Sequence, residues 1–143
     1  MGATVSSRRL TAQAATAAVQ AAVDQARALG VAINAAVVDA GGNLIAFLRD
    51  DGAFTASVAI AQDKARTAAG FAMPSRTLYD AIKGEPDVLN GIANRPGIAA
   101  FPGGLPIRDQ GCLVGAIGVS GASAEQDETC AQAGIAALGL GLQ

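Results

Sequence analysis

Few side chains in this sequence are able to move a proton or hold a charged ligand, and Lys64 is the first of them. It lies in the segment "QDKARTA", within an alanine-rich stretch. A lone lysine among alanines is costly to bury unless it meets a charge or a ligand. We therefore predict that Lys64 binds a ligand or acts as a general base. The alternative is a solvent-exposed position beside Asp63 and Arg66.

A second charged group lies in "LRDDGAF", where Arg49 precedes Asp50 and Asp51. A planar guanidinium binds a carboxylate through two parallel N–H groups. Arg49 is therefore predicted to hold a ligand carboxylate, and Asp51 is a candidate for acid–base chemistry. An arginine beside two carboxylates is also typical of a local ion-pair cluster. Among the other carboxylates, Asp127 is expected to stabilise the first turn of the last helix through the helix dipole.

Aromatic side chains are scarce. Three of the four phenylalanines, Phe54, Phe71 and Phe101, lie beside a turn or a helix end. Such rings can form a flat apolar wall for an aromatic or tetrapyrrole ligand. Phe54 and Phe101 are therefore predicted to contact the ligand, and ordinary packing in the core or between subunits is the alternative.

Glycines are concentrated in "FPGGLPIRDQGCLVGAIGVSG", which fills positions 101–121. Within it, "GAIGVSG" has the spacing G-x-x-G-x-x-G, which is not the dinucleotide-binding pattern G-x-G-x-x-G. Gly115 and Gly118 are expected to let a helix or a partner subunit approach the strand, since glycine in a strand usually marks close backbone approach. Gly103, Gly104 and Pro106 are predicted to form a rigid loop that leaves room for a ligand.

The absence of histidine excludes several kinds of site. Without it the chain lacks the usual general base, the usual zinc and haem ligand, and any Ser–His or Cys–His pair. No metal site and no required cofactor are expected. The two cysteines, Cys112 and Cys130, are too few for a disulfide framework and are expected to be buried, inert thiols.

Charge and hydropathy narrow the class of protein further. The net charge of −2 provides no basic field for nucleic acid. No signal peptide and no apolar run of membrane length is recognised, so we expect a cytoplasmic protein that does not contact membranes. A length of 143 residues fits one domain with a substantial core. The prediction is a single domain over residues 1–143, with residues 1–9 disordered.

Hydrophobic spacing and turn residues predict the elements that must position these side chains. Helices are expected at about 10–29, about 55–70 and from 123 onward, with one or two short helices between 75 and 95. Strands are expected at about 31–39 and 43–49, followed by two or three strands at about 98–101, 105–108 and 112–120. Because strands and helices do not alternate, the pattern favours an antiparallel sheet with helices packed on it.

Three segments, "VVDAGGNLIAFLRDDGA", "IAQDKARTA" and "PGGLPIRDQGCLVGAIGVSGASAEQDE", resemble the GlcG/HbpS-like family, and the resemblance extends over roughly residues 10–138. It implies an α+β domain, profilin-like, in three α/β/α layers around a five-stranded antiparallel sheet. It also implies homo-oligomers, from dimers to octamers. Some members of this family bind haem or a related tetrapyrrole, others accompany genes for small-acid or aromatic catabolism, and a few resemble cofactor-free enzymes.

The sequence departs from the family pattern at Asn43. Many relatives have histidine after the turn glycines, and no histidine elsewhere in this chain replaces it. Haem held by imidazole is therefore impossible here. The remaining donors, Tyr79, Cys112, Met73 and Thr67, are weak substitutes.

These observations favour a homo-oligomeric protein that binds a small organic or aromatic acid. Its pocket is predicted from the "PGGLP" loop, the "RDDGAF" turn and the helix that carries Lys64. One alternative is a cofactor-independent isomerase, deaminase or hydrolase of small-molecule or aromatic catabolism, with Lys64 or an aspartate as base. A second alternative is a haem- or tetrapyrrole-binding module without a histidine ligand, which the absence of histidine disfavours.

Overall fold

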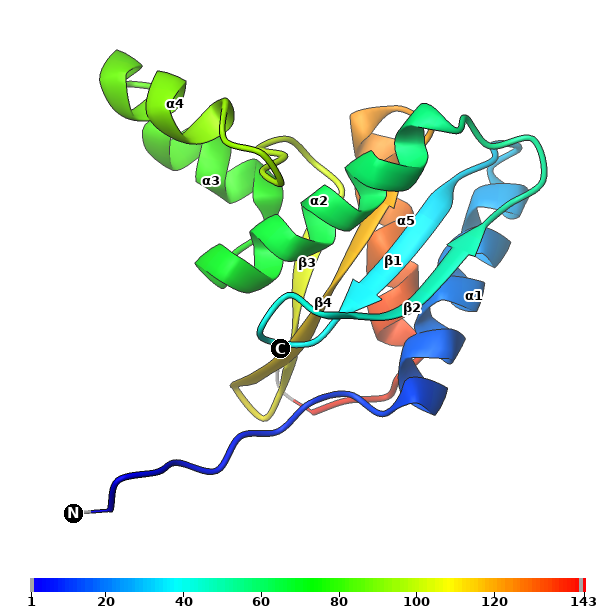
Figure 1. The fold of residues 1–143 in the computed structure, drawn as a ribbon. Coiled ribbons are helices and arrows are strands. Elements are labelled where there is room, and N and C mark those ends of the chain that lie inside the picture. The colour runs from blue at the N-terminus through cyan, green and yellow to red at the C-terminus, as the bar shows by residue number, and fades with distance from the viewer. Residues whose placement is uncertain (1, 142) are drawn as a thin grey trace.

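The computed structural model describes residues 2–141 and 143. Along the chain, the helices and strands are α1 (Ala12–Ala28), β1 (Asn34–Val38), β2 (Leu44–Arg49), α2 (Ala56–Phe71), α3 (Ser75–Ile82), α4 (Pro86–Ala93), β3 (Gly104–Asp109), β4 (Cys112–Ser120) and α5 (Ala124–Ala136). Figure 1 shows one sheet with helices on both faces. The expected α+β class is therefore confirmed.

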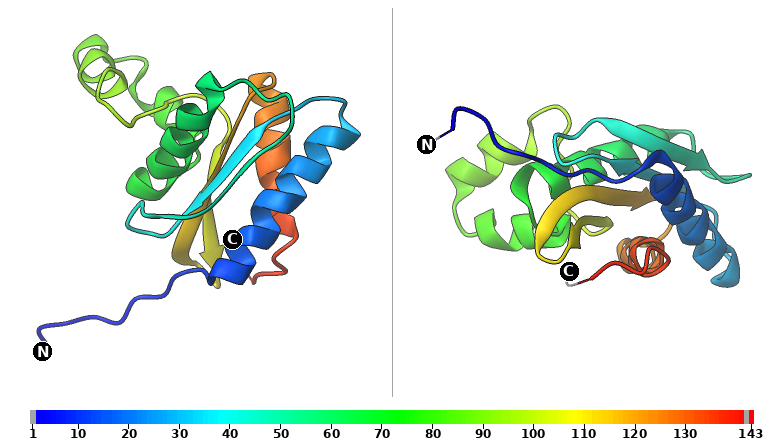
Figure 2. Two further views of the ribbon diagram at one scale, coloured as in Figure 1. Left: turned by 45° about the vertical axis from the view of Figure 1, so that its right-hand side comes forward. Right: turned by 90° about the horizontal axis from the view of Figure 1, so that it is seen from below.

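The sheet is antiparallel throughout, with the strand order β2-β1-β4-β3. Helices α1 and α5 cover one face and α2 crosses the other, which produces three layers (Figures 1 and 2). Every residue of the central strand β1 is buried, because both faces of that strand are covered. Helices α3 and α4 lie beyond the end of α2 and project from the body; we call residues 75–93 the α3–α4 arm.

The expected fifth strand at 98–101 is wrong, since the sheet formed by the described residues has four strands. Side chains of other elements bind the backbone of this segment instead. The hydroxyl of Thr67 accepts a hydrogen bond from the amide of Ala99 at 2.9 Å, and the hydroxyl of Ser75 donates one to the carbonyl of Phe101. These backbone groups are thereby removed from any sheet ladder.

Side chains cap the starts of α1 and α5. The side chain of Thr11 accepts a hydrogen bond from the amide of Ala14 and caps α1. Ser123 and Gln126 form a capping box at the start of α5. These two helices pack on the face of the sheet that holds most of the large aliphatic side chains.

The opposite face, under α2, is built mostly from alanine, with Val38 and Phe47 as its larger apolar side chains. Ala61, Ala65 and Ala68 of α2 pack on the small residues Ala36 and Ala116 of the sheet. A Cβ atom on Gly118 would overlap the backbone of α2. The predicted close approach of a helix to this glycine is confirmed.

Residues 2–9 belong to no helix or strand; the start of this segment extends away from the body (Figure 1), whereas Arg8 forms an ion pair with Asp109 of β3. Their expected disorder stays a prediction, and Met1 lies outside the described residues. Among the described residues, no helix is both long and apolar enough to cross a membrane.

Candidate functional site

Lys64 lies at the centre of α2 and is fully buried between this helix and the sheet. Its ammonium group donates hydrogen bonds to the carbonyl of Val119 at 2.9 Å and to Asp127 Oδ2 at 3.1 Å. The solvent-exposed position that was the alternative for this lysine is therefore wrong. A carboxylate and a carbonyl provide the charge and the acceptors that make its burial tolerable.

Asp127 lies in the first turn of α5, as expected, and is itself buried. Its other oxygen, Oδ1, accepts a hydrogen bond from the amide of Ala122 at 2.9 Å. Burial raises the pKa of Asp127, an effect that Lys64 and the amides of Ala122 and Gly121 oppose. Burial likewise lowers the pKa of the Lys64 amine, and Asp127 opposes that change. Burial therefore favours the neutral form of both groups, and their mutual attraction favours the charged form.

Phe101 covers this ion pair. The nitrogen of Lys64 lies 4.6 Å from the centroid of the Phe101 ring, within the range of a cation–π contact. The ring is 45% exposed, so it contacts Lys64 while remaining partly open to solvent. Two of the predicted ligand contacts, Lys64 and Phe101, are thus brought together, although they come from elements that are distant in the sequence.

Gly103 and Gly104 lie against the same lysine. A Cβ atom on Gly103 would lie 2.7 Å from the Lys64 nitrogen, and one on Gly104 would overlap the Lys64 backbone. The space beside these glycines, expected to be open for a ligand, is therefore filled by α2. Pro106 follows within β3, where it lies opposite Ala116 of β4.

Ser75 joins this loop to the α3–α4 arm and was missed as a site residue. Its buried hydroxyl accepts a hydrogen bond from the amide of Gly104 at 2.9 Å while donating to the carbonyl of Phe101. From the sequence we expect Ser75 only to cap a helix, but in the structure Pro74 holds the N-cap position and Ser75 is the first residue of α3. The sequence does not reveal its real partners, because both lie more than twenty residues away. Ser75 therefore fixes the backbone on both sides of Pro102.

An apolar pocket of about 530 Å³ opens between the arm and the 98–102 segment. Its walls include Tyr79 of α3, Leu89 and Ala93 of α4, and Ile98 and Phe101 of the connecting segment. A volume of this size is typical of small-molecule sites. Tyr79 is 44% exposed, so two half-exposed aromatic rings face this space.

Arg76 lines the same pocket and also a neighbouring hollow that contains Glu125 and Glu128. Its Nε donates to Glu128 Oε2 at 2.9 Å, and one of its terminal nitrogens lies 3.8 Å from Glu125 Oε1. The pKa of Arg76 is raised by the hydrogen bond to Glu128 and by the charge of that residue, so it stays a cation. A guanidinium has five N–H donors, so these contacts leave others for a ligand.

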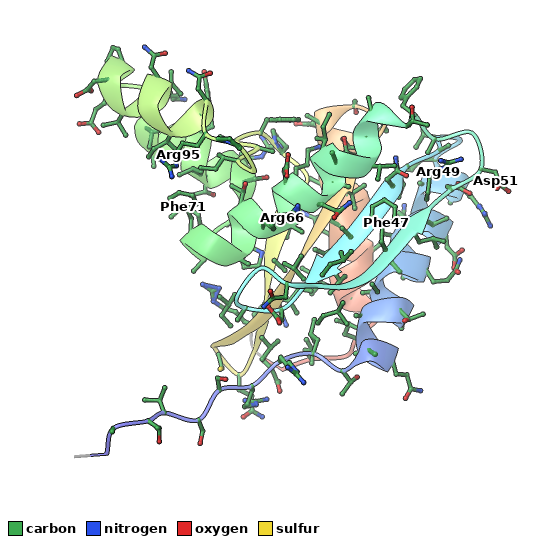
Figure 3. All side chains as sticks on the ribbon, viewed as in Figure 1. Phe47, Arg49, Asp51, Arg66, Phe71 and Arg95 are labelled. Atoms are coloured by element: carbon green, nitrogen blue, oxygen red, sulfur yellow. The ribbon has the colours of Figure 1, made fainter. Side chains whose placement is uncertain are left out.

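The remaining predicted site residues lie elsewhere. Arg49 and Asp51 are exposed where β2 leads into α2, on the opposite side of Figure 3 from Phe71 and Arg95. Phe54 lies in the same connection and is 69% exposed. None of these residues lines the pocket beside Phe101.

Asp50 forms the ion pair of this connection, and its partner is Arg27 of α1. The distance between Asp50 Oδ1 and the Arg27 guanidinium is 2.7 Å. The hydrogen bond to Arg27 lowers the pKa of Asp50, with further help from the amide of Asp51, against an opposing effect of burial. The predicted ion-pair cluster at this turn is therefore real, but Arg27 rather than the adjacent Arg49 provides its cation.

The cysteines differ from one another. Cys130 is buried, and burial raises the pKa of its thiol to about 11, so it is an inert thiol as expected. Cys112 is exposed at the start of β4, so its expected burial is wrong. Among the described residues, no group of three or more histidine, cysteine, aspartate or glutamate side chains is arranged to hold a metal ion.

Comparison with known proteins identifies the family. Residues 10–136 match the family described as "Haem degrading protein HbpS-like". This chain belongs to the HbpS-like family. The family resemblance predicted from the three sequence segments is thereby confirmed.

Individual relatives agree with this assignment. A 15.0 kDa protein of Citrobacter freundii, encoded in the dhaT-dhaS intergenic region, is 35% identical over 124 residues, or 86% of this chain and 87% of that protein. A double mutant of HbpS from Streptomyces reticuli is 38% identical, with a TM-score of 0.87 over 97% of this chain and 93% of that one. The structure of a PduOC:heme complex is 32% identical, with a TM-score of 0.85 over 93% of this chain and 97% of that one.

Asn43 lies in the turn after β1, where the family resemblance led us to expect a histidine. Asn43 occupies that position and forms hydrogen bonds with Asp39 through its amide and its side chain. The pKa of Asp39 is lowered mainly by the backbone amide of Asn43. In this HbpS-like chain the position therefore closes a turn.

Proposed function

We propose that this protein binds a flat organic acid in the pocket between the α3–α4 arm and the 98–102 segment. The observation that carries the proposal is the composition of that pocket, about 530 Å³ of mostly apolar space with Tyr79 and Phe101 in its walls. Aromatic walls favour a planar ligand, because rings stack or pack edge to face on one another. A few polar groups then fix the orientation of such a ligand.

Arg76 provides the polar group that suits a carboxylate. It lies one turn before Tyr79 on α3, and both side chains line the pocket. The Glu128 contact orients the guanidinium without using all its donors. A ligand carboxylate at the edge of the pocket therefore meets a fixed cation, while its aromatic or aliphatic part lies against Leu89, Ile98 and Phe101.

Haem is the second candidate, supported by the similarity to the PduOC:heme complex. The pocket suits a porphyrin in its apolar walls, and Arg76 suits a propionate group. Among the residues that line it, Tyr79 is the one side chain of a type that serves as an axial haem ligand. An iron porphyrin bound here supplies a redox-active metal, and the protein contributes the apolar walls, the cation and one phenol.

Catalysis by Lys64 and Asp51 stays a prediction. Lys64 uses its ammonium group in bonds to Val119 and Asp127 beneath Phe101, so acid–base use requires that ring to move. Asp51 lies at a separate exposed turn. Assembly into a homo-oligomer and a role in catabolism are likewise proposals, drawn from the family resemblance. A cytoplasmic location is also a proposal.

The test is a binding titration of the whole chain with aromatic acids, 2-oxo acids, iron-free protoporphyrin IX and hemin, read by fluorescence and thermal shift. Ala93→Glu places bulk and negative charge in the pocket, and Ala17→Glu makes the same change on an exposed residue of α1. We expect at least one acid or porphyrin to bind, and Ala93→Glu alone to weaken it by about tenfold or more, equivalent to about 1.4 kcal/mol. Unchanged binding by Ala93→Glu, or no binding at all by the native chain, overturns the proposal.

A further inference from the structure

We propose that Tyr79 is the axial ligand of ferric haem in this protein, through its phenolate oxygen. The inference rests on the proposed function, since it requires that the pocket accept a porphyrin. It assigns to one residue of α3 the role that a histidine cannot have in a chain without histidine.

The donors within the pocket leave one choice. Arg76 is a cation and has no lone pair to offer. Asp80 contacts Lys83 at 3.3 Å on the surface of α3. Tyr79, the sole tyrosine of the chain, lines the pocket with its ring half exposed, and its hydroxyl has no hydrogen-bond partner among the described residues.

The other candidate haem ligands suggested by the sequence are excluded by their positions in the structure. Thr67 is buried, and its hydroxyl already bonds the carbonyl of Asp63 and the amide of Ala99. Cys112 begins β4 beside the β3–β4 turn, and neither it nor Met73 lines the pocket. Asp80 also lines the pocket and is exposed, but its carboxylate pairs with Lys83. Tyr79 is the lining residue whose oxygen is of a type that ligates haem iron and that makes no side-chain ion pair.

The helical spacing adds a second argument. Arg76 and Tyr79 are separated by three residues, so they lie on the same face of α3, and both line the pocket. One helix therefore offers a cation for a propionate and an oxygen for the iron. A phenolate is a hard, anionic oxygen donor and suits ferric iron. On ligation the O–H bond of Tyr79 breaks, an iron–oxygen bond forms, the proton passes to solvent and the iron remains ferric.

The experiment compares the native chain with Tyr79→Phe, which keeps the ring and removes the oxygen. Each is titrated with hemin and, separately, with iron-free protoporphyrin IX. We expect protoporphyrin IX to bind both proteins within about twofold, and hemin to bind Tyr79→Phe about tenfold more weakly. We also expect the phenolate–iron vibration in the resonance Raman spectrum and the matching visible charge-transfer band to vanish in Tyr79→Phe.

The two proposals fail in different ways. If native protein and Tyr79→Phe give the same ferric spectrum and the same hemin affinity, Tyr79 is not the ligand, although the pocket still binds porphyrin. If neither hemin nor protoporphyrin IX binds the native chain, the porphyrin form of the proposed function is wrong and the ligand assignment falls with it. Loss of protoporphyrin IX binding in Tyr79→Phe also overturns the assignment, because the Tyr79 hydroxyl then contributes to porphyrin binding without any iron.

Discussion

The junction between α2 and the sheet and the α3–α4 arm both pair cations with carboxylates, at opposite extremes of burial. In the junction, Lys64 and Asp127 are almost completely buried, with side-chain exposures of 1% and 4%. In the arm, Lys83 and Asp80 form a pair with exposures of 55% and 56%. None of the residues of α4, all of which are described, is buried. Breaking a lysine–aspartate pair is therefore expected to change the free energy of unfolding by very different amounts in the two regions.

Because of this difference, the region that stabilises the fold is largely distinct from the region proposed to bind the ligand. The junction depends on close backbone approach at Gly104 and Gly118 and on a single buried charge pair. The arm contributes helices with few buried side chains and half of the residues that line the pocket. Phe101 belongs to both regions, because it covers Lys64 and lines the pocket.

The largest effect is expected from Gly118→Ala. The added methyl group would overlap the backbone of α2 at Ala61 and Ala65, and backbone cannot rotate away as a side chain can. We expect a loss of about 4 kcal/mol or more in the free energy of unfolding, or failure to fold, measured by urea denaturation. A loss below about 1 kcal/mol would show that α2 does not depend on this contact.

The next largest effect is expected from Lys64→Met. Methionine keeps much of the volume of lysine but leaves Asp127 buried without its cation, which costs about 3–5 kcal/mol. Lys83→Met is the matched control, and there the loss of an exposed pair is expected to change stability by no more than about 1 kcal/mol. Urea denaturation of both variants measures the difference.

A double-mutant cycle separates the ion pair from simple packing. Asp127→Asn keeps an oxygen for the Ala122 amide, and Lys64→Met/Asp127→Asn then has no unpaired charge. We expect a coupling free energy of about 1–3 kcal/mol between the two positions. A coupling near zero would mean that Lys64 stabilises the junction through its hydrocarbon chain alone.

A third pair, Arg27–Asp50, is intermediate in burial and provides a pH test. The folded state holds the pKa of Asp50 below 3.8, mainly through the Arg27 hydrogen bond. Between the folded and the unfolded pKa of Asp50, the unfolded chain therefore binds more protons than the folded chain. The stability that ionised Asp50 contributes is complete above the unfolded pKa and is lost as the pH falls through the folded pKa.

The expected result is that the stability difference between native protein and Asp50→Asn is constant near neutral pH and shrinks below about pH 4. Thermal unfolding between pH 2.5 and 7 measures it. Asp51→Asn, which removes a charge from the same turn without breaking the Arg27 bond, is the control. If the native–Asp50→Asn difference persists at the lowest pH, the Arg27 contact is not what stabilises this turn.

The smallest effect, with the opposite sign from Gly118→Ala, is expected from Gly91→Ala. Gly91 lies inside α4, and an added Cβ atom would meet no heavy atom within 4 Å. Alanine in a helix interior is favoured over glycine by about 0.5–1 kcal/mol. We expect a small increase in thermal stability by calorimetry, and a decrease would show that α4 packs more closely than its exposure indicates.

Much of the fold is predictable from local signals. The helix of residues 12–28, the hairpin and the capping box at Ser123 follow from spacing, turn glycines and cap residues. The expected strand at 98–101 fails because its backbone is bound by Thr67 and Ser75. Thr67 and Ser75 lie more than twenty residues before this segment, so no local sequence pattern reveals these hydrogen bonds.

The candidate site is predictable only in part, for the same reason. Lys64 is recognisable because a buried lysine needs a partner, but Asp127 lies 63 residues further along the chain. From the sequence, Arg49 and Phe101 are equally good candidates for ligand contact, because each lies beside a turn. In the structure Arg49 lies at the far side of the molecule from the end of α2 that leads into the arm (Figure 3). The order of the strands in the sheet decides which turns lie close together. Local patterns in a single sequence do not reveal that order.

The hydroxyl groups of Thr67 and Ser75 have a further consequence for variation of this protein. They fix the 98–104 segment to α2 and the start of α3, so one wall of the pocket is held by the folded body. The opposite wall comes from α3 and α4, and none of the residues of α4 is buried. Ligand preference can therefore diverge through changes on α4 with little loss of stability, which makes this helix the place to randomise in a selection for new ligands.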